Sequence, residues 1–203
     1  MDNIDYLFLE ITSFCNMHCS FCPSDVLKRK KCKIKTENAI KFITEIHDMG
    51  IKKPIHLNVL GEPFLNNDIF IILDLLNKLE FTVILITNFV LLENKNLEKL
   101  MNYNNIVLVL SLQTLTVNSY KMRNYNNLTF NDYIDKIFNI IEYKFRSRNN
   151  IRIEIHIAST HTLLYHDSTY IADSPLYKIN KIFNNDKELK KRLDWFIIKI
   201  VVF

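Results

Sequence analysis

The sequence predicts an α/β protein built on a parallel sheet. Short stretches that alternate apolar and polar residues recur along the chain, and between them lie longer stretches whose apolar residues repeat every three or four positions. Strands that alternate with helices of this length imply right-handed crossovers between parallel strands. The periodicity leaves two architectures open, a doubly wound open sheet and a sheet curled toward a barrel. In both of them the chemistry belongs at the carboxyl ends of the strands.

The elements follow one another in a regular order. The first strand is predicted over residues 6–12, and the first helix begins near Thr36 as its N-cap and ends at Gly50, because hydroxyl residues favour helix starts and glycine favours helix ends. The later predicted elements are strand 55–60, helix 68–79, strand 82–87, helix 94–102, strand 106–112, helix 129–145 and strand 151–157. Helices near 175–183 and 186–193 follow, and the apolar run 195–203 fits a sixth strand.

Composition favours a single domain over residues 1–203. A chain of 203 residues with 48% hydrophobic residues can bury one continuous core, and no linker-like segment interrupts it. The first residues lack a basic segment, and no apolar run reaches the roughly 18 residues that a membrane span requires. We therefore expect a cytoplasmic protein without a membrane partner. The net charge of +4 is too small to indicate a nucleic-acid-binding protein.

Three of the four cysteines fall in one short segment after the first predicted strand. Cys15, Cys19 and Cys22 lie within eight residues, so a single loop can wrap them around one metal centre. A disulfide framework is not expected in a reducing compartment. A structural zinc site closes with four ligands and an ordinary 4Fe-4S cluster takes four cysteines, so three cysteines leave one position open. An open position can bind a small molecule.

Several predicted strands carry polar residues on one face. Successive strand residues face opposite sides, and a parallel sheet covered by helices on both sides would be apolar on both. A sheet with one polar face is more consistent with a lumen, which the metal centre would cap. The residues that share these faces are Glu10 with Thr12, His56 with Asn58, Ser111 with Gln113, and Arg152 with Glu154 and His156.

The cysteine loop resembles the signature of the radical S-adenosylmethionine (SAM) superfamily. That signature is a CxxxCxxC loop after the first strand, with an aromatic residue before the last cysteine, and Phe21 occupies the aromatic position. The resemblance implies that Cys15, Cys19 and Cys22 hold a 4Fe-4S cluster whose fourth iron binds the amino and carboxylate groups of SAM. It also implies reductive cleavage of SAM to a 5′-deoxyadenosyl radical that abstracts hydrogen from a substrate. The fold implied is a partial (β/α) barrel of five to six parallel units.

A second segment of the resemblance follows the second predicted strand. Leu60-Gly61-Glu62-Pro63 is similar to the Gly-Gly-Glu-Pro segment that binds the SAM amino group in the family, with Leu60 in place of the first glycine. Gly61 is one of only two glycines in the chain. A backbone that must approach a ligand closely is a physical reason for glycine at this position. Phe21 is expected at the adenine end of SAM, and Gly61 and Glu62 at its methionine end.

Weaker matches lie at the ends of later strands. The Thr-Asn-Phe segment at 87–89 resembles the family's Thr-Asn-Gly, and the Ser-Leu-Gln segment at 111–113 resembles a Ser-x-Asp segment that contacts SAM. Arg123 stands where many members carry an arginine, and the resemblance extends over residues 6–157. With His156, which reads equally as a structural histidine, the candidate cofactor-binding residues are Phe21, Gly61, Glu62, Asn88, Ser111, Gln113, Arg123 and His156.

Partners and rival functions remain open at this point. The motif Cys-Asn-x-x-Cys-x-x-Cys-Pro resembles most the motif of members that modify peptides or build cofactors. We therefore expect a peptide or a small molecule as substrate. A flavodoxin or ferredoxin would supply a low-potential electron. The basic run 28–33 reads as a solvated loop or as a patch that steers an acidic partner. One rival function is a zinc-binding interaction protein that adds Cys32 to the three loop cysteines. Another is an inactive fold of the same family.

The end of the chain suggests an incomplete barrel. The run 195–203 reads as a buried strand with no helix after it, and a parallel strand requires cover on both faces. No cysteine follows Cys32, so this chain has no ligands for the auxiliary clusters of peptide-modifying relatives. We expect natural members to carry further C-terminal sequence.

Overall fold

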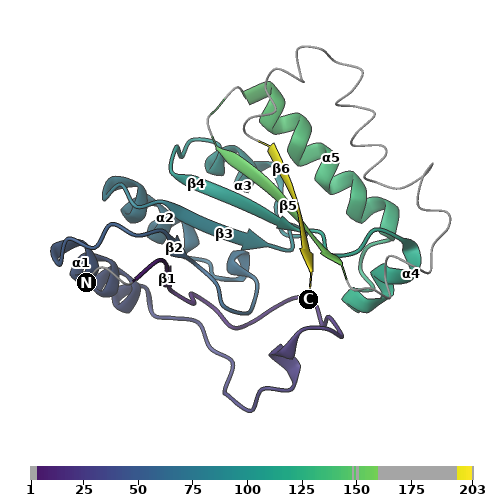
Figure 1. The fold of residues 1–203 in the computed structure, drawn as a ribbon, viewed down its shortest axis with the longest axis horizontal. Helices are drawn as coiled ribbons and strands as arrows, with labels where there is room; N and C mark the ends of the chain where they lie inside the picture. The colour runs from purple at the N-terminus through teal and green to yellow at the C-terminus, as the bar shows by residue number, and fades with distance from the viewer. Residues whose placement is uncertain (1–3, 148, 150, 160–195, 203) are drawn as a thin grey trace.

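The fold is a partial barrel of six parallel strands that pair in chain order (Figure 1). The computed structural model describes residues 4–147, 149, 151–159 and 196–202. Its strands are β1 (Leu7–Phe8), β2 (Ile55–His56), β3 (Val83–Thr87), β4 (Ile106–Ser111), β5 (Arg152–Ser159) and β6 (Phe196–Val202). A doubly wound sheet reverses its strand order at one point, whereas a β/α barrel adds each strand next to the previous one. The sequential order therefore identifies the barrel architecture.

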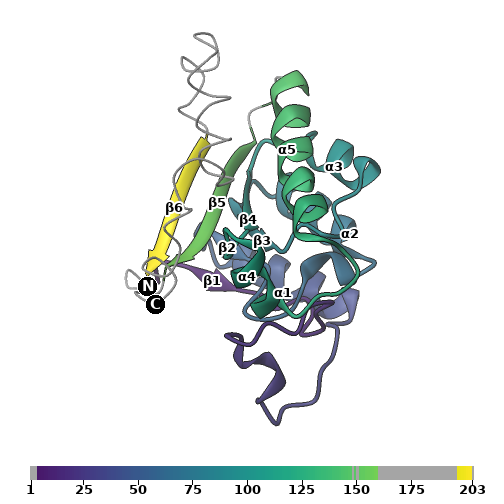
Figure 2. The same cartoon turned by 90° about the vertical axis from the view of Figure 1, so that its right-hand side faces the viewer.

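The long helices lie on one face of this sheet. Figure 2 shows α1, α2, α3 and α5 on the same side, and no described helix covers the opposite face, which we call the inner face. The one-sided arrangement agrees with a partial barrel, and the predicted polar lumen stays a prediction. The helices are α1 (Thr36–Asp48), α2 (Ile69–Lys78), α3 (Asn94–Leu100), α4 (Val117–Tyr120) and α5 (Phe130–Ser147), with short 3-10 turns η1 (Pro23–Asp25), η2 (Pro63–Leu65) and η3 (Lys121–Arg123).

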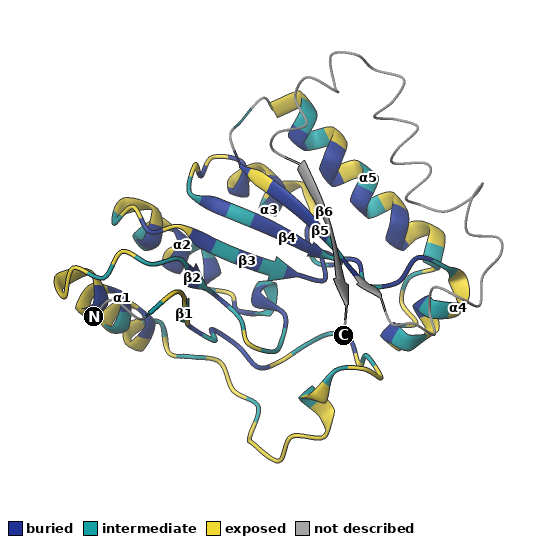
Figure 3. Cartoon of the chain, viewed as in Figure 1, coloured by how far each residue is buried: buried dark blue, intermediate teal, exposed yellow. Residues whose placement is uncertain are grey.

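The core fills the space between the sheet and its helices (Figure 3). Along β3, Val83, Leu85 and Thr87 are buried on the helix side, and Ile84 and Ile86 are only half-buried on the inner face. The helices contribute matching apolar stripes of fully buried side chains. Each such side chain stabilises the fold by roughly 1.5–3 kcal/mol. The packing of the helices on this side therefore holds the sheet together.

The first two strands are shorter than the sequence predicts. The amides of Leu9 and Ile11 still donate to the carbonyls of His56 and Leu57, at 2.8 and 3.3 Å, but the ladder is confined to two residues in each strand. Beyond it, the carbonyl of Ile11 accepts from Ile34, and Thr12 forms an antiparallel bridge with Lys33. The predicted strand 6–12 therefore changes its partner halfway, because the segment before α1 folds back onto it.

One other prediction needs correction, and several short elements were not predicted. The N-cap of α1 is Lys35 and not Thr36, whose hydroxyl instead donates to Asp68 at 2.6 Å. The sequence analysis did not predict α4 or the 3-10 turns, because segments of three or four residues carry no readable periodicity. The helices expected near 175–183 and 186–193 lie outside the described residues, and the assignment of the chain to one domain stays a prediction.

None of the described helices combines the length and the apolar character needed to cross a bilayer.

Two helices end in the same left-handed turn, one with glycine and one without. Gly50 follows α1 at a φ of 71°, and Glu80 follows α2 at a φ of 58°. In both turns the next amide donates to the carbonyl five residues back, at 3.0 Å. This is the position where helices favour glycine, since a side chain in the left-handed region costs about 1–2 kcal/mol.

We expect Glu80→Gly to raise the free energy of unfolding by about 1 kcal/mol, because glycine adopts this conformation without a steric cost. Gly50→Ala is the matched change in the opposite direction, since a Cβ there meets no atom within 4 Å and only the backbone conformation is penalised. It should lower the free energy of unfolding by about the same amount. Urea denaturation of both variants measures the effects, and a Glu80→Gly protein less stable than wild type would contradict the assignment.

Candidate metal and cofactor site

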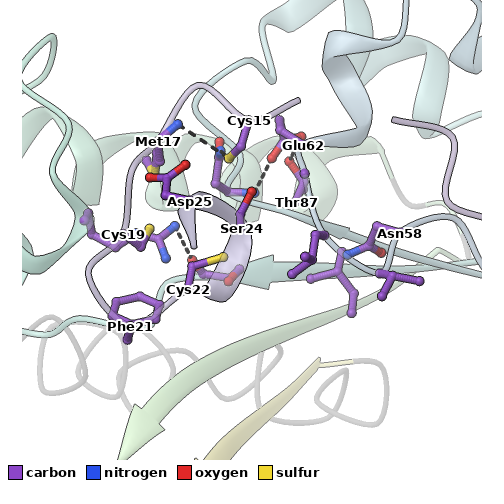
Figure 4. Close-up of a pocket in the computed structure, with 17 residues that line it drawn as sticks. Cys15, Met17, Cys19, Phe21, Cys22, Ser24, Asp25, Asn58, Glu62 and Thr87 are labelled. Atoms are coloured by element: carbon purple, nitrogen blue, oxygen red, sulfur yellow. Dashed lines mark hydrogen bonds between the residues drawn. The ribbon is translucent and has the colours of Figure 1, made fainter. Parts of the chain in front are cut away.

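A cavity lies where the loop after β1 meets the carboxyl ends of β2, β3 and β4 (Figure 4). This is the end of the barrel at which the sequence predicted the chemistry. Figure 4 shows the three loop cysteines around the cavity, with Phe21 and Asn58 at opposite ends. The lining residues are Cys15, Met17, Cys19, Phe21, Cys22, Ser24, Asp25, Asn58, Val59, Leu60, Gly61, Glu62, Ile86, Thr87, Asn88, Ser111 and Arg123.

The three predicted ligand cysteines all line this cavity. Cys15, Cys19 and Cys22 are free thiols of intermediate burial. Burial raises the pKa of the Cys15 and Cys19 thiols, although the nearby Arg123 guanidinium pulls both pKa values down. Without a metal these thiols are protonated at neutral pH. A bound metal would hold them as thiolates, so metal binding releases protons here.

The three loop cysteines match the ligand set of an iron-sulfur cluster, and the fourth cysteine that the zinc alternative needs is not among the residues that line the cavity. A zinc site requires four ligands around one centre, whereas a cluster takes its cysteines at separate irons. Cys32, which the zinc alternative needs, is exposed and does not line the cavity. His18 is instead paired with Asp25, at 2.9 Å between Nδ1 and Oδ2.

The cysteine loop is held by backbone hydrogen bonds at several points. The amide of Ser20 donates to the carbonyl of Met122 at 2.9 Å, and the amide of Glu62 donates to the carbonyl of Phe14 at 2.7 Å. At the start of the loop, Ser13 and Cys32 exchange hydrogen bonds through their backbones and the Ser13 hydroxyl. The loop is therefore fixed to η3, to the end of β2 and to the segment before α1.

Gly61 is required by this packing of backbone on backbone. Its φ is 85°, and a Cβ at this position would lie 2.4 Å from the carbonyl oxygen of Thr12 and 2.9 Å from that of Phe14. The glycine is expected from the sequence to allow close approach of a ligand, whereas the structure shows a close approach of the chain's own loop. Leu60 lies outside the left-handed region, so the glycine that it replaces is not needed for backbone conformation.

Glu62 joins the ends of β2 and β3 through a buried carboxylate. Glu62 as a whole is only 1% exposed to solvent. Oε1 accepts hydrogen bonds from the Thr87 hydroxyl at 2.7 Å and the Phe64 amide at 3.3 Å, and Oε2 accepts from the Asn88 amide at 2.7 Å. Burial raises the pKa of Glu62 to about 7, against these hydrogen bonds, which lower it. The carboxyl group is therefore poised to respond to a charged ligand.

Asn88 and Phe89 extend the site from the end of β3. The Asn88 side-chain amide donates to Asn16 at 2.7 Å and lies 3.8 Å from the Cys15 sulfur. Phe89 takes the place of a family glycine and keeps a left-handed φ of 54°, at a cost of about 1–2 kcal/mol. Its ring is fully buried, with its centroid 4.5 Å from that of Tyr133, and this packing offsets the cost.

Arg123 is a buried cation in the wall of the cavity. It is 3% exposed, and its Nη2 donates to the carbonyl of Ser111 at 3.2 Å. Its Nε is buried and has no hydrogen-bond partner in the described structure. The guanidinium carbon lies 5.8 Å from the centre of the Phe21 ring and 5.9 Å from that of Tyr133. A cation near the Cys15 and Cys19 thiols lowers their pKa and so favours the thiolate forms that bind metal.

Two candidate residues lie beside the cavity and not in its lining. Gln113 has a left-handed φ of 61° and donates from Nε2 to the Ser111 hydroxyl at 2.9 Å. His156 lies on β5 and pairs through Nε2 with Glu154 at 3.1 Å. The structure thus gathers Phe21, Gly61, Glu62, Asn88, Ser111 and Arg123 around the three cysteines. Gln113 and His156 stay predictions as SAM contacts.

Other lining residues were not singled out as SAM contacts by the sequence. Asn58 was noticed only for its strand face, yet it lines the cavity and its buried Oδ1 has no partner in the described structure. Asp25 had no sequence signal at all. It lines the cavity and binds His18 and Lys31, the latter at 3.0 Å. In the basic run, Arg29 also has a partner, Glu10, at 2.6 Å to each carboxylate oxygen.

Comparison with known proteins gives a consistent family assignment. The family model described as the radical SAM superfamily matches residues 9–165. Among solved structures, anSMEcpe with bound AdoMet aligns at a TM-score of 0.64 and 17% identity over 98% of this chain and 51% of its own. Streptococcus suis SuiB bound to the precursor peptide SuiA aligns at 0.61 and 17% identity over 96% and 48%.

A third solved structure contains a different bound molecule. TYW1 with a lysine-pyruvate adduct aligns at a TM-score of 0.57 and 15% identity, over 97% of this chain and 62% of its own. At these identities the likeness concerns the fold alone. The chain spans about half the length of SuiB and anSMEcpe. No curated protein sequence matches it.

The pKa of Glu62 predicts a pH-dependent stability of the metal-free protein. Since the folded pKa is about 7 and the ordinary value is 4.5, the folded state binds more protons than the unfolded state between these pH values. The free energy of unfolding should therefore fall by about 3 kcal/mol as pH rises across this window. Glu62→Gln should remove that slope. Denaturation at several pH values measures it, with the exposed Glu142→Gln as control, and an unchanged slope in Glu62→Gln would be inconsistent with a buried, protonated Glu62.

Proposed function

Because the chain belongs to the radical SAM superfamily, we propose that it is an enzyme that cleaves SAM reductively at a 4Fe-4S cluster held by Cys15, Cys19 and Cys22. The observation that supports this proposal is the shared cavity. Three half-buried thiols of one loop face the same space as Glu62 and Arg123, at the carboxyl ends of the strands.

The difficult chemistry would come from the cofactors. Cys15, Cys19 and Cys22 would hold the cluster, and the bound cofactors would supply one-electron cleavage of SAM to methionine and a 5′-deoxyadenosyl radical that abstracts a substrate hydrogen atom. The chain's own task is to hold, orient and shield. Three cysteines leave the fourth iron open for SAM, and a buried site excludes water from the reaction.

The polar residues of the cavity suit the two ends of SAM. The Glu62 carboxylate accepts hydrogen bonds and can accept one more from an amino group, while the buried Arg123 can pair with a carboxylate. We place the methionine end at Gly61 and Glu62 and the adenine end at Phe21, whose ring is 43% exposed and lines the cavity. Asn88 would hold the loop through Asn16, next to the first cysteine.

The substrate class and the electron donor extend this proposal. SuiB is a structural relative bound to a precursor peptide, and the cysteine-loop wording is similar to that of peptide-modifying members. We propose a peptide or small-molecule substrate, with a flavodoxin or ferredoxin as donor, in the cytoplasm. An inactive member of the fold would bind cluster and SAM and yet form no 5′-deoxyadenosine. Anaerobic reconstitution with dithionite, followed by chromatography of the products, tests this directly.

Serine variants of the four cysteines should separate into two groups. Cys15→Ser, Cys19→Ser and Cys22→Ser each remove a ligand, so each should lower cluster binding by more than about tenfold. Cys32→Ser should keep the wild-type iron content, because its side chain is exposed and outside the cavity. Iron and sulfide analysis with visible absorbance measures both. If Cys32→Ser loses iron as completely as Cys19→Ser, a four-cysteine site replaces the three-cysteine one.

Changes at the end of β2 should weaken SAM binding. Gly61→Ala forces the loop away from the Thr12 carbonyl, and Glu62→Gln removes the negative charge, so each should lower SAM affinity by more than about tenfold, or 1.4 kcal/mol. Gly50→Ala is the matched glycine control and should bind SAM normally. Anaerobic isothermal titration of the cluster-loaded proteins gives the affinities. Unchanged affinity in both variants would remove SAM from this position.

A further inference from the structure

The inner face of β5 carries three titratable or charged side chains in a row. Arg152, Glu154 and His156 are alternate residues of the strand and therefore share one face. Ile153 and Ile155 between them are fully buried in the core. The row consequently faces the side of the sheet that the described helices leave uncovered (Figure 2).

An ion pair and a hydrogen bond join the three residues. Glu154 Oε1 lies 2.9 Å from an Arg152 guanidinium nitrogen, and Oε2 lies 3.1 Å from His156 Nε2. The Glu154 side chain is only 5% exposed, whereas that of Arg152 is 45% exposed and that of His156 is 20% exposed. The acceptor is thus buried behind its partners, and the accessible surface of the row belongs to the cation and the imidazole.

Stability alone does not account for this row. In register across the sheet, Val107 of β4 pairs with Arg152, and Val109 pairs with Glu154, so the same face is apolar one strand away. Taking a carboxylate out of water costs several kcal/mol, and apolar residues of similar volume often give equal or greater stability than a buried ion pair. A face that served packing alone would continue the valines of β4. The charges on β5 therefore point to a ligand.

The row also continues the wall of the cofactor cavity. Ser111 lines the cavity and pairs in register with His156. Neighbouring strands lie roughly 4.8 Å apart, so His156 is one strand beyond the cavity wall, and Arg152, four residues earlier, lies roughly 13 Å from His156 along the strand. A molecule whose reacting end enters the cavity can reach Arg152 only with an elongated body.

We propose that the inner face of β5 binds the substrate and that Arg152 takes an anionic group of it, a carboxylate or a phosphate. The identification of this ligand as the substrate rests on the proposed function. A guanidinium has five N–H donors in a planar fork that matches both anions, and the Glu154 carboxylate competes with an anionic ligand for this fork. With Nε2 donating to Glu154, His156 presents Nδ1 as a hydrogen-bond acceptor beside the cavity.

Phosphate and acetate are the two anions that test the site in the full chain. The thermal midpoint of the cluster-loaded protein is followed against sodium phosphate and sodium acetate at constant ionic strength, since an anion that binds the native state raises the midpoint in a saturable way. We expect saturation with at least one anion, and an affinity at least about tenfold weaker in Arg152→Gln. Stronger binding of phosphate indicates a phosphorylated substrate, and stronger binding of acetate indicates a carboxylate.

Matched variants separate recognition from general charge effects. Arg146→Gln removes an equal charge from α5, where Arg146 pairs with Glu142 on an exposed surface, and should leave anion affinity unchanged. Glu154→Gln keeps the side-chain volume and removes the competing negative charge, so it should bind the anion about tenfold more tightly. If Arg152→Gln does not fold, the anion affinity of Glu154→Gln tests whether the anion binds at Arg152.

The inference is overturned by an absent or unsaturable effect, by equal affinity in wild type and Arg152→Gln, or by a Glu154→Gln protein that binds no more tightly than wild type. Iron content and 5′-deoxyadenosine formation by the wild type test the proposed function separately. The anion titration can therefore fail while the cluster and SAM cleavage are present, and the reverse outcome is equally distinguishable.

Discussion

The candidate site depends on the contact between the loop after β1 and the turn after β2. Gly61 lies so close to the carbonyls of Thr12 and Phe14 that no other residue fits without displacing one of them. The Glu62 amide then donates to Phe14, and the Glu62 carboxylate reaches the end of β3. One glycine contact thus sets the position of the cysteine loop relative to two strand ends. The cavity exists because these three segments meet there.

The electrostatics of the cavity follow from the same packing. Burial leaves Glu62 with a pKa of about 7 and raises the pKa of Cys15 and Cys19, while Arg123 stays charged in the wall. Each of these groups is costly to bury by itself. Ligands that ionise the thiols and pair with the carboxyl and guanidinium groups would relieve that cost. Binding and stability are therefore linked at this site.

The sequence predicted the parts of the molecule that have a strong local signal. The strand and helix order, the helix end at Gly50 and the cysteine loop all follow from periodicity or spacing that can be read along the chain. The shortening of β1 could not be predicted, because it results from pairing of Thr12 with Lys33, twenty-one residues away. The reason for Gly61 was also out of reach. A close contact with the chain's own loop and a close contact with a ligand both require glycine, so the sequence does not distinguish them.

An aromatic stack supports the cavity from behind. Phe89 packs on Tyr133, Tyr133 on Tyr120, and Tyr120 on Phe130, with ring centres 4.5 to 5.7 Å apart, and the Tyr133 hydroxyl donates to the carbonyl of Ser111. A glycine in place of Phe89 would leave this stack without its first member. The identity of the residue at position 89 is therefore tied to α5, and substitutions on that helix should be selected together with it. A homologue with glycine at position 89 is expected to carry a larger side chain at position 133. Residues 89 and 133 should therefore covary among homologues of this chain.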